Sequence, residues 1–221
     1  MTTAVDSLRP ALLAILEQLR LPAPKSKADA LLGYVELLLK WNARYNLTAV
    51  REPAEMLKQH FADCLAVIEP LQRQVGQSPR RLLDVGSGGG FPGVVIAIMC
   101  PAIDVTCVDS VGKKSAFIQQ AASELKLKNL HARHDRIQQL HALEFDVVTS
   151  RAFASLADFT ASTTQLLAKD GIWMAMKGKV PDDELTALPN SVEVFHVEQL
   201  SVPSLAAARC LVWMRQGTQV A

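Results

Sequence analysis

The sequence predicts an α/β fold, in which helices cover both faces of a mostly parallel sheet and a helical extension precedes that sheet. Two observations indicate this fold. From residue 81 onward, short apolar runs of strand length alternate with segments of helical periodicity. Before residue 76, apolar residues recur at helical spacing alone. The chain has 221 residues, of which 49% are hydrophobic, so it is long and apolar enough to bury a sizeable core.

Residues 1–75 are expected to form an N-terminal helical extension packed on the core. Apolar residues recur at helical spacing in two successive segments. The first contains Leu8, Leu12, Ile15, Leu16 and Leu19, and the second contains Leu31, Leu32, Val35, Leu38 and Leu39. A third helix is expected to begin near Pro53 and to carry His60 and Asp63. The polar stretch over residues 73–81 predicts a boundary between this extension and a core over residues 76–221.

The core is expected to contain seven strands. They are predicted over residues 81–86, 103–109, 129–135, 145–150, 171–177, 192–200 and 208–215. Helices are predicted over residues 91–100, 113–127 and 158–168, with Pro92 in the first turn of the first one. No segment of helical length separates the last two strands, so they are expected to form an antiparallel pair.

Composition and cysteine usage exclude several classes of protein. The net charge is +1 and charged residues make up 20%, which excludes a disordered chain and means that any basic surface is local. The cysteines are scattered and form no C-x-x-C pair, which favours reduced core thiols over a disulfide framework or a metal site; they are Cys64, Cys100, Cys107 and Cys210. The first residues do not resemble a secretory signal, and no run is long enough to span a membrane, so we expect a cytoplasmic protein.

A glycine-rich stretch, LLDVGSGGGFPG from Leu82 to Gly93, follows the first strand and opens the first helix of the core. In a doubly wound sheet this position binds ligands, at the carboxyl ends of the strands. The lysine that a phosphate-binding P-loop requires is missing. A dinucleotide fingerprint needs a third glycine where Phe91 stands, which counts against a dinucleotide without excluding it.

Carboxylates around this loop favour S-adenosylmethionine as the ligand. The spacing is D-x-G-x-G-x-G, with Asp84 followed by Gly86, Gly88 and Gly90. At the mouth of the loop, Asp84 is expected to repel a pyrophosphate and to attract the ammonium and sulfonium groups of S-adenosylmethionine. Asp109 ends the second strand, where a carboxylate can accept both ribose hydroxyls of a nucleoside. A glycine turn with two helix-capping aspartates remains the alternative.

Three stretches in this order resemble the bacterial 16S ribosomal RNA guanine-N7 methyltransferase family, also called glucose-inhibited division protein B. They are LLDVGSGGGFPG, VDSVGKKSAFI and SRAFAS, and the upstream KWNARYNLTAVREPAEMLKQHFADC strengthens the resemblance, which runs roughly from Leu31 to Arg215. The resemblance implies a Rossmann-like, seven-stranded class I S-adenosylmethionine-dependent methyltransferase with an N-terminal helical extension. It also implies a cytoplasmic enzyme, expected to be a monomer, whose substrate is a guanine in the 16S rRNA of the small ribosomal subunit.

The resemblance also implies roles for particular residues. Gly86 and Phe91 are expected beside the cofactor, together with Ser87 and Gly88 of the same loop. Ile137 and Gln138, after the third strand, are expected near the adenine, although Gln138 stands where an acidic residue is common in the family. Arg151, at the end of the fourth strand, falls on a position that faces both cofactor and substrate.

Guanine N7 carries a free lone pair, so attack on the sulfonium methyl removes no proton from the nucleophile. In-line displacement without a general base is therefore expected, with catalysis by positioning. Arg151 is the candidate catalytic residue, because a guanidinium there can bind guanine O6 or a phosphate bidentately. An ion pair that orients a local carboxylate is the alternative for Arg151. An N-P-P-Y tetrad, typical of methylation at exocyclic amines, is absent where SRAF stands.

A local basic patch for RNA is expected from Arg136, Arg151, Lys177 and Arg209, which are predicted near strand ends. For Arg136, Lys177 and Arg209 taken singly, a solvated surface charge is the alternative. His60 is added to these RNA-binding candidates and is expected to titrate near neutrality.

His60 and Asp63 share one helical face, and the polar groups of Trp41, Asn42, Tyr45 and Asn46 precede them. These groups either frame the target base or form a buried polar lock between extension and sheet. Two rival functions stay open from the residues alone: methylation of a small molecule or protein, and nucleoside-dependent regulation without turnover.

Overall fold

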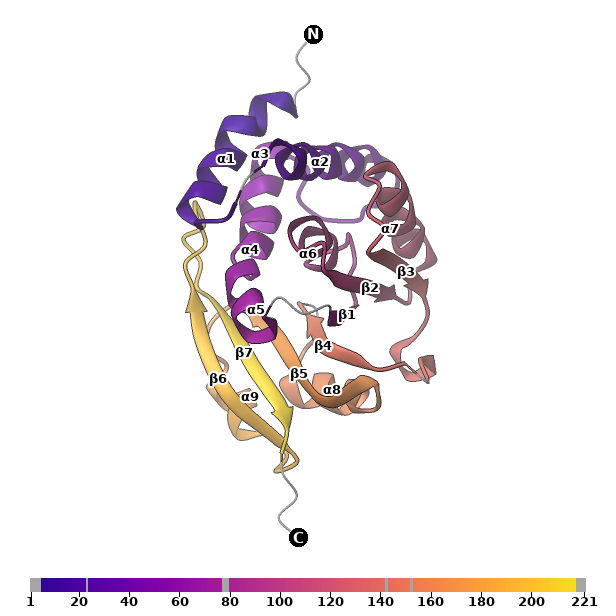
Figure 1. The fold of residues 1–221 in the computed structure, drawn as a ribbon, viewed down its shortest axis with the longest axis vertical. Helices are drawn as coiled ribbons and strands as arrows, with labels where there is room; N and C mark the ends of the chain where they lie inside the picture. Colours follow the sequence, from indigo (N-terminus) through magenta and orange to yellow (C-terminus); the bar gives the residue numbers. More distant parts are fainter. Residues whose placement is uncertain (1–4, 23, 77–79, 142, 152, 218–221) are drawn as a thin grey trace.

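A computed structural model describes residues 5–22, 24–76, 80–141, 143–151 and 153–217. Its centre is a seven-stranded sheet in the order β3-β2-β1-β4-β5-β7-β6 (Figure 1). The strands are β1 (Arg80–Val85), β2 (Ile103–Asp109), β3 (Leu130–His134), β4 (Phe145–Ser150), β5 (Leu167–Lys177), β6 (Val192–Leu200) and β7 (Arg209–Gln216). The first five strands are parallel, and β7 runs antiparallel to β5 and β6. The predicted antiparallel pair at the end of the chain is therefore confirmed.

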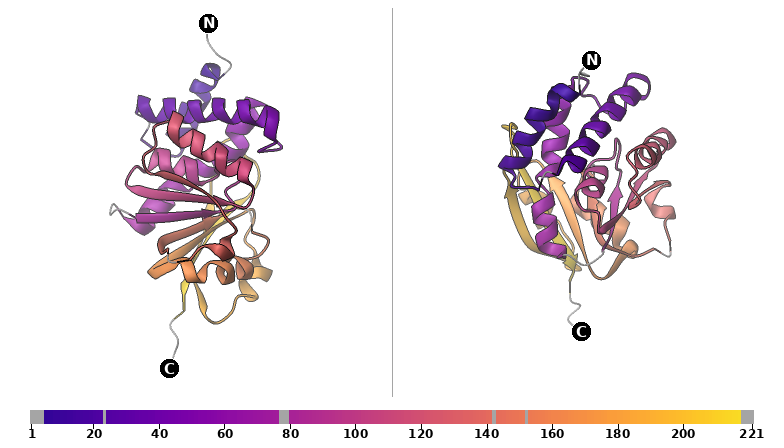
Figure 2. Two further views of the ribbon diagram at one scale, coloured as in Figure 1. Left: turned by 90° about the vertical axis from the view of Figure 1, so that its right-hand side faces the viewer. Right: turned by 45° about the horizontal axis from the view of Figure 1, so that its top comes forward.

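Each face of the sheet is covered by its own set of helices (Figure 2). One face packs against α1 (Arg9–Gln18), α2 (Lys25–Tyr45), α5 (Ile68–Val75), α6 (Gly93–Met99) and α7 (Gly112–Glu124). The other face packs against α8 (Leu156–Thr163) and, at its margin, α9 (Asp182–Thr186). Successive strand residues face opposite ways, so Leu82 joins the first core and Leu83 the second.

The helical extension shares one hydrophobic core with the sheet. Tyr34 of α2 is fully buried, and its ring packs against those of Phe61 and Phe91, with centroids 5.1 Å and 5.5 Å apart. Residues of the extension and of the sheet thus contribute to the same core. The domain boundary at residues 75 and 76 stays a prediction, and residues 77–79 of the expected polar turn lie outside the described residues.

The segment expected as a third helix consists of several pieces. The short helix α3 (Pro53–Met56) is followed by a π-helical turn over Leu57–Phe61 and then by α4 (Ala62–Leu65). The π turn carries His60, and α4 carries Asp63. Turns of this type are rare and occur often at functional sites.

Two predicted boundaries are wrong. The helix expected over residues 158–168 ends at Thr163 and is followed by a 3-10 turn over Thr164–Leu166; the hydroxyls of Thr160 and Thr163 donate to carbonyls one turn back, which bends and weakens a helix. Strand β5 begins at Leu167 rather than at residue 171. Its pairing with β4 shifts register after Phe145, so the polar residues before Gly171 form a bulge. In the sequence these polar residues resemble a loop, so the start of the strand is not recognised.

The cysteines and two tryptophans lie in the interior. All four cysteines are free and buried, as predicted. Trp173 and Trp213 are fully buried in the core. No helix among the described residues has both the length and the apolar character needed to cross a membrane.

Candidate active site

The glycine-rich loop connects the end of β1 to α6, and its backbone requires glycine. Gly86, Gly88 and Gly90 have φ values of +68°, +58° and +89°, which residues with a β-carbon rarely adopt. A β-carbon at Gly90 would also lie 2.4 Å from Val94 Cγ2. The tight loop therefore depends on the glycines that mark it in the sequence.

A first cavity, which we call the donor pocket, lies at the carboxyl ends of β1, β2 and β3. Its volume is about 630 Å³, and it is lined by four residues predicted to bind the cofactor: Gly86, Asp109, Ile137 and Gln138. Arg136, predicted to bind RNA, lines this pocket as well.

Asp109 is largely buried at the edge of the donor pocket and is held in place by the backbone. Its Oδ2 accepts the Gly88 N–H at 2.9 Å, and its Oδ1 accepts the Val111 N–H at 2.9 Å. Lys114 Nζ lies 3.6 Å from Oδ2. Each carboxylate oxygen has a second lone pair, so this fixed carboxylate can still accept the two hydroxyls of a ribose.

The donor pocket also contains residues that the sequence analysis did not predict, among them Lys114, Asp135 and Phe153. Asp135 directly follows β3, as Asp109 ends β2, and that position at a strand end was a usable signal. Phe153 comes from the loop after β4, whose approach to this pocket depends on the order of strands in the sheet.

Asp84 does not lie at the mouth of the loop, and that prediction is wrong. The side chain is fully buried, because β1 is a central strand and the loop and α6 cover its end. Its Oδ2 accepts the Gly93 N–H at the start of α6 at 2.8 Å, while its Oδ1 has no hydrogen-bond partner within the part of the chain that the structure describes. Burial raises the pKa of Asp84 to about 7. Both aspartates thus accept a backbone N–H beside a helix start, as the capping alternative expected, but Asp109 also lines the donor pocket.

Other residues of the predicted cofactor set lie beside the donor pocket rather than in its lining. Ser87 is almost fully buried. Phe91 is also buried, and its ring stands 4.9 Å from the His60 ring and 5.2 Å from the Arg151 guanidinium carbon. Phe91 therefore contacts residues of the second pocket described next.

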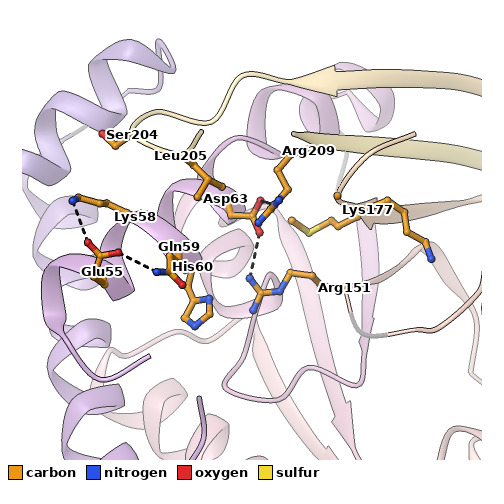
Figure 3. Close-up of a pocket in the computed structure, with 12 residues that line it drawn as sticks. Glu55, Lys58, Gln59, His60, Asp63, Arg151, Lys177, Ser204, Leu205 and Arg209 are labelled. Carbon is orange, nitrogen blue, oxygen red and sulfur yellow. Dashed lines mark hydrogen bonds and ion pairs between the residues drawn. The ribbon is translucent and has the colours of Figure 1, made fainter. Parts of the chain in front are cut away.

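That second cavity, the acceptor pocket, lies at the ends of β4, β5 and β7 and has a volume of about 590 Å³ (Figure 3). Its lining brings together Arg151, Lys177, Arg209, His60 and Asp63, from four separate stretches of chain. Three of the four predicted basic residues therefore share one rim, whereas Arg136 lines the donor pocket instead.

Asp63 joins two of these cations. Its buried carboxylate accepts Arg209 Nε at Oδ1 over 3.0 Å and lies 3.4 Å from Arg151 Nη1 at Oδ2 (Figure 3). The contact links α4 of the extension to β4 and β7, so Asp63 forms a polar lock and also lines the pocket. Arg151 therefore orients a local carboxylate, as its alternative expected, with one edge still facing the cavity. Lys177 is paired separately with Glu184 at 2.7 Å.

His60 is held as a neutral ring. Its Nε2 lies 2.7 Å from Thr48 Oγ1, and its buried Nδ1 has no partner among the described residues. Burial, reinforced by the charge of Arg151, lowers the pKa of His60 to about 4. The expectation that His60 titrates near neutrality is therefore wrong.

The polar group just before His60 is divided between two places. Asn42 is buried and locks the loop that follows α2: its Nδ2 donates to the Val50 carbonyl at 3.1 Å, and its Oδ1 accepts the Thr48 N–H at 2.9 Å. Trp41 and Tyr45 line a third cavity instead of the acceptor pocket.

Comparison with known proteins identifies the fold and the family. Solved structures with similar folds include TrmN from Thermus thermophilus, with a TM-score of 0.55 and 18% identity over 72% of this chain and 53% of that chain. They also include an S-adenosylmethionine-dependent methyltransferase from Aquifex aeolicus, with a TM-score of 0.54 and 15% identity over 74% of this chain and 98% of that one. These likenesses confirm the class I methyltransferase fold.

Sequence relatives are much closer than these structures. Ribosomal RNA small subunit methyltransferase G of Leptothrix cholodnii is 56% identical over 94% of this chain and 95% of its own length. The protein of the same name from Paracidovorax citrulli is 54% identical over 97% and 93%. The family described as GidB, rRNA small subunit methyltransferase G, matches residues 27–212. The chain therefore belongs to the rRNA small subunit methyltransferase G family, as the resemblance in its motifs predicted.

Proposed function

We propose that the protein transfers a methyl group from S-adenosylmethionine, held in the donor pocket, to N7 of a guanine of 16S rRNA held in the acceptor pocket. Its family and its fold make it an S-adenosylmethionine-dependent methyltransferase of small-subunit rRNA. The assignment of residues to the two ligands is our proposal.

One observation carries this assignment: a single loop contributes to both pockets. Arg151, at the end of β4, lines the acceptor pocket, and Phe153 and Ala154 of the same loop line the donor pocket. The pockets also flank the position where the strand order reverses, between β1 and β4. Ligands of doubly wound sheets bind at such switch points.

The donor pocket fits S-adenosylmethionine. Asp109 offers fixed carboxylate oxygens for the ribose, and Ile137 with Phe153 offers apolar surface for the adenine. When bound, S-adenosylmethionine supplies an electrophilic methyl group on a sulfonium.

In the acceptor pocket, the chain's task is to orient the guanine. Arg151 can hold O6 or a phosphate through the guanidinium edge that Asp63 leaves open, while Arg209 and Lys177 bind phosphates of the neighbouring nucleotides. His60, uncharged at neutral pH, packs beside the base. N7 carries no proton that must be removed. The reaction therefore requires no proton acceptor, neither His60 nor any other residue.

The wider setting of the reaction is also proposed. We place the enzyme in the cytoplasm, as a monomer that acts on 16S rRNA within the small ribosomal subunit. We also propose that the reaction uses no metal. Within the described ranges, no three metal-ligating side chains cluster.

Tritiated methyl transfer to unmodified small subunits tests the assignment. Arg151→Ala should lower kcat more than it weakens RNA binding, because the guanidinium orients the reacting base. Lys169→Ala, an exposed cation at the opposite end of β5, is the matched control and should behave as wild type. An Arg151→Ala enzyme with unchanged kcat, or wild-type enzyme that labels ribosomal protein or small molecules instead, would contradict the proposal.

A further inference from the structure

A third cavity lies outside both pockets, between the last turns of α2 and the second half of α7, two helices that pack side by side (Figure 1). Its volume is about 600 Å³. The lining contains Lys40, Trp41, Arg44 and Tyr45 from α2 and Gln120 and Glu124 from α7. We call this cavity the α2–α7 groove.

Two contacts establish the direction of the groove. A β-carbon at Gly33 would lie 3.0 Å from Leu125 Cδ2, at the end of α7. Further along α2, the ring of Trp41 packs on that of Phe117, nearer the start of α7, with centroids 5.5 Å apart. The helices therefore run antiparallel, and Tyr45 at the end of α2 lies toward the start of α7. That start borders the donor pocket, so the Tyr45 end of the groove faces the reacting edge of the sheet.

The groove combines exposed aromatic surface with positive charge. The rings of Trp41 and Tyr45 lie 5.0 Å apart, and Tyr45 is 40% exposed. Arg44 is exposed beside them, and Arg51 is exposed on the loop that follows α2. Within the part of the chain that the structure describes, neither arginine has a carboxylate partner, whereas Lys40 is paired with Glu36 at 2.9 Å. Glu124 lines the same groove and accepts a hydrogen bond from Gln120. Lys40 and Glu36 cancel, so Arg44, Arg51 and Glu124 together leave one net positive charge at this site.

A chain of hydrogen bonds connects the groove to the acceptor pocket. Asn42, next to Trp41, is bonded to Thr48 and Val50 of the following loop. Thr48 in turn is bonded to His60, which lines the acceptor pocket. These hydrogen bonds hold the loop after α2 in place between the end of that helix and His60.

We propose that the α2–α7 groove binds a single-stranded segment of the same rRNA that carries the target guanine, with a base stacked on Tyr45 and phosphates at Arg44 and Arg51. The proposal rests on the proposed function. Aromatic rings stack on unpaired bases, and arginines hold the phosphates between them. The positive charge suits a polyanion, whereas a second copy of this chain would bring like charges to the same surface.

Binding of protein-free 16S rRNA at several salt concentrations, together with methylation of small subunits, tests this proposal. Tyr45→Ala should weaken rRNA binding about 5- to 50-fold and raise the KM for subunits similarly, because the stacking surface is lost. Tyr45→Phe keeps the ring and should bind as wild type. Arg44→Gln should reduce the salt dependence of binding by roughly one phosphate's share. Lys169→Gln is the control and should change neither measurement.

Several results would overturn the proposal. Unchanged rRNA binding by Tyr45→Ala removes the groove from the RNA surface. Weakening with small subunits but not with protein-free rRNA assigns the groove to a ribosomal protein. A raised KM for S-adenosylmethionine or a lower melting temperature in Tyr45→Ala means that the residue acts through the fold. Failure of the proposed function is distinguishable, because rRNA binding reports on the groove even if methylation occurs at another atom.

Discussion

Replacement of Asp63 tests whether the acceptor pocket is held together by its buried carboxylate. The Asp63 side chain is 4% exposed, and those of Arg151 and Arg209 are 27% and 26% exposed. Removing one partner of a fully buried ion pair costs about 3–5 kcal/mol. Water can reach both arginines, so we expect Asp63→Ala to lower the free energy of unfolding by about 2–3 kcal/mol. Asp63→Asn keeps one acceptor and should cost about half as much.

The two contacts should differ in strength, and double-mutant cycles can separate them. Arg209 Nε lies 3.0 Å from Asp63, whereas Arg151 Nη1 lies 3.4 Å away. We therefore expect a coupling free energy of about 1–2 kcal/mol between Asp63 and Arg209, and below about 1 kcal/mol between Asp63 and Arg151. Urea unfolding followed by tryptophan fluorescence measures both. Couplings near zero, or a larger coupling to Arg151, would refute this account of the pocket.

Three further predictions concern the donor pocket and pH. Asp109→Ala should weaken S-adenosylmethionine binding about 10- to 100-fold in titration calorimetry, because a charge-assisted contact is lost. Asp104→Ala, on the exposed end of β2, is the control and should leave this affinity unchanged. Because burial raises the pKa of Asp84 from 3.8 to about 7, its contribution to stability is complete below pH 4 and is lost as the pH rises through 7. The stability of wild type relative to Asp84→Asn should thus fall by on the order of 3–4 kcal/mol between pH 4 and 8 in urea unfolding, and a constant difference would contradict the buried proton. The pKa of His60 is about 4, so His60→Gln should leave the shape of the single-turnover pH profile unchanged from about pH 6.5 to 8.5. A wild-type rate that rises through neutral pH, with no such rise in His60→Gln, would argue for a general base.

Hydrophobic periodicity was sufficient to predict most of the sheet. β2, β4 and β6 match their predicted ranges, because each is an apolar or alternating run bounded by polar residues. The start of β5 was missed, because the residues that bulge there are polar and resemble a loop. The π turn that carries His60 has no marker in a helical pattern, since helix periodicity and composition continue through it.

The site was predictable where it lies next to a recognisable motif. Gly86 and Asp109 follow strands, and strand ends meet at one edge of a parallel sheet. The burial of Asp84 and the depressed pKa of His60 depend on which elements cover them, and no local pattern records this. The contact of Asp63 with Arg209 joins residues 146 positions apart, which only the folded chain brings together.

We propose that the methylated atom is N7 of one guanine and that no general base takes part. N7-methylated guanine is labile to borohydride reduction followed by aniline, which cleaves the RNA chain at that nucleotide. After incubation of small subunits with the enzyme and tritiated S-adenosylmethionine, we expect label in 16S rRNA and scission at a single guanine, with both reduced in Arg151→Ala. Label in 16S rRNA without scission would place the methyl group on another atom and contradict the account.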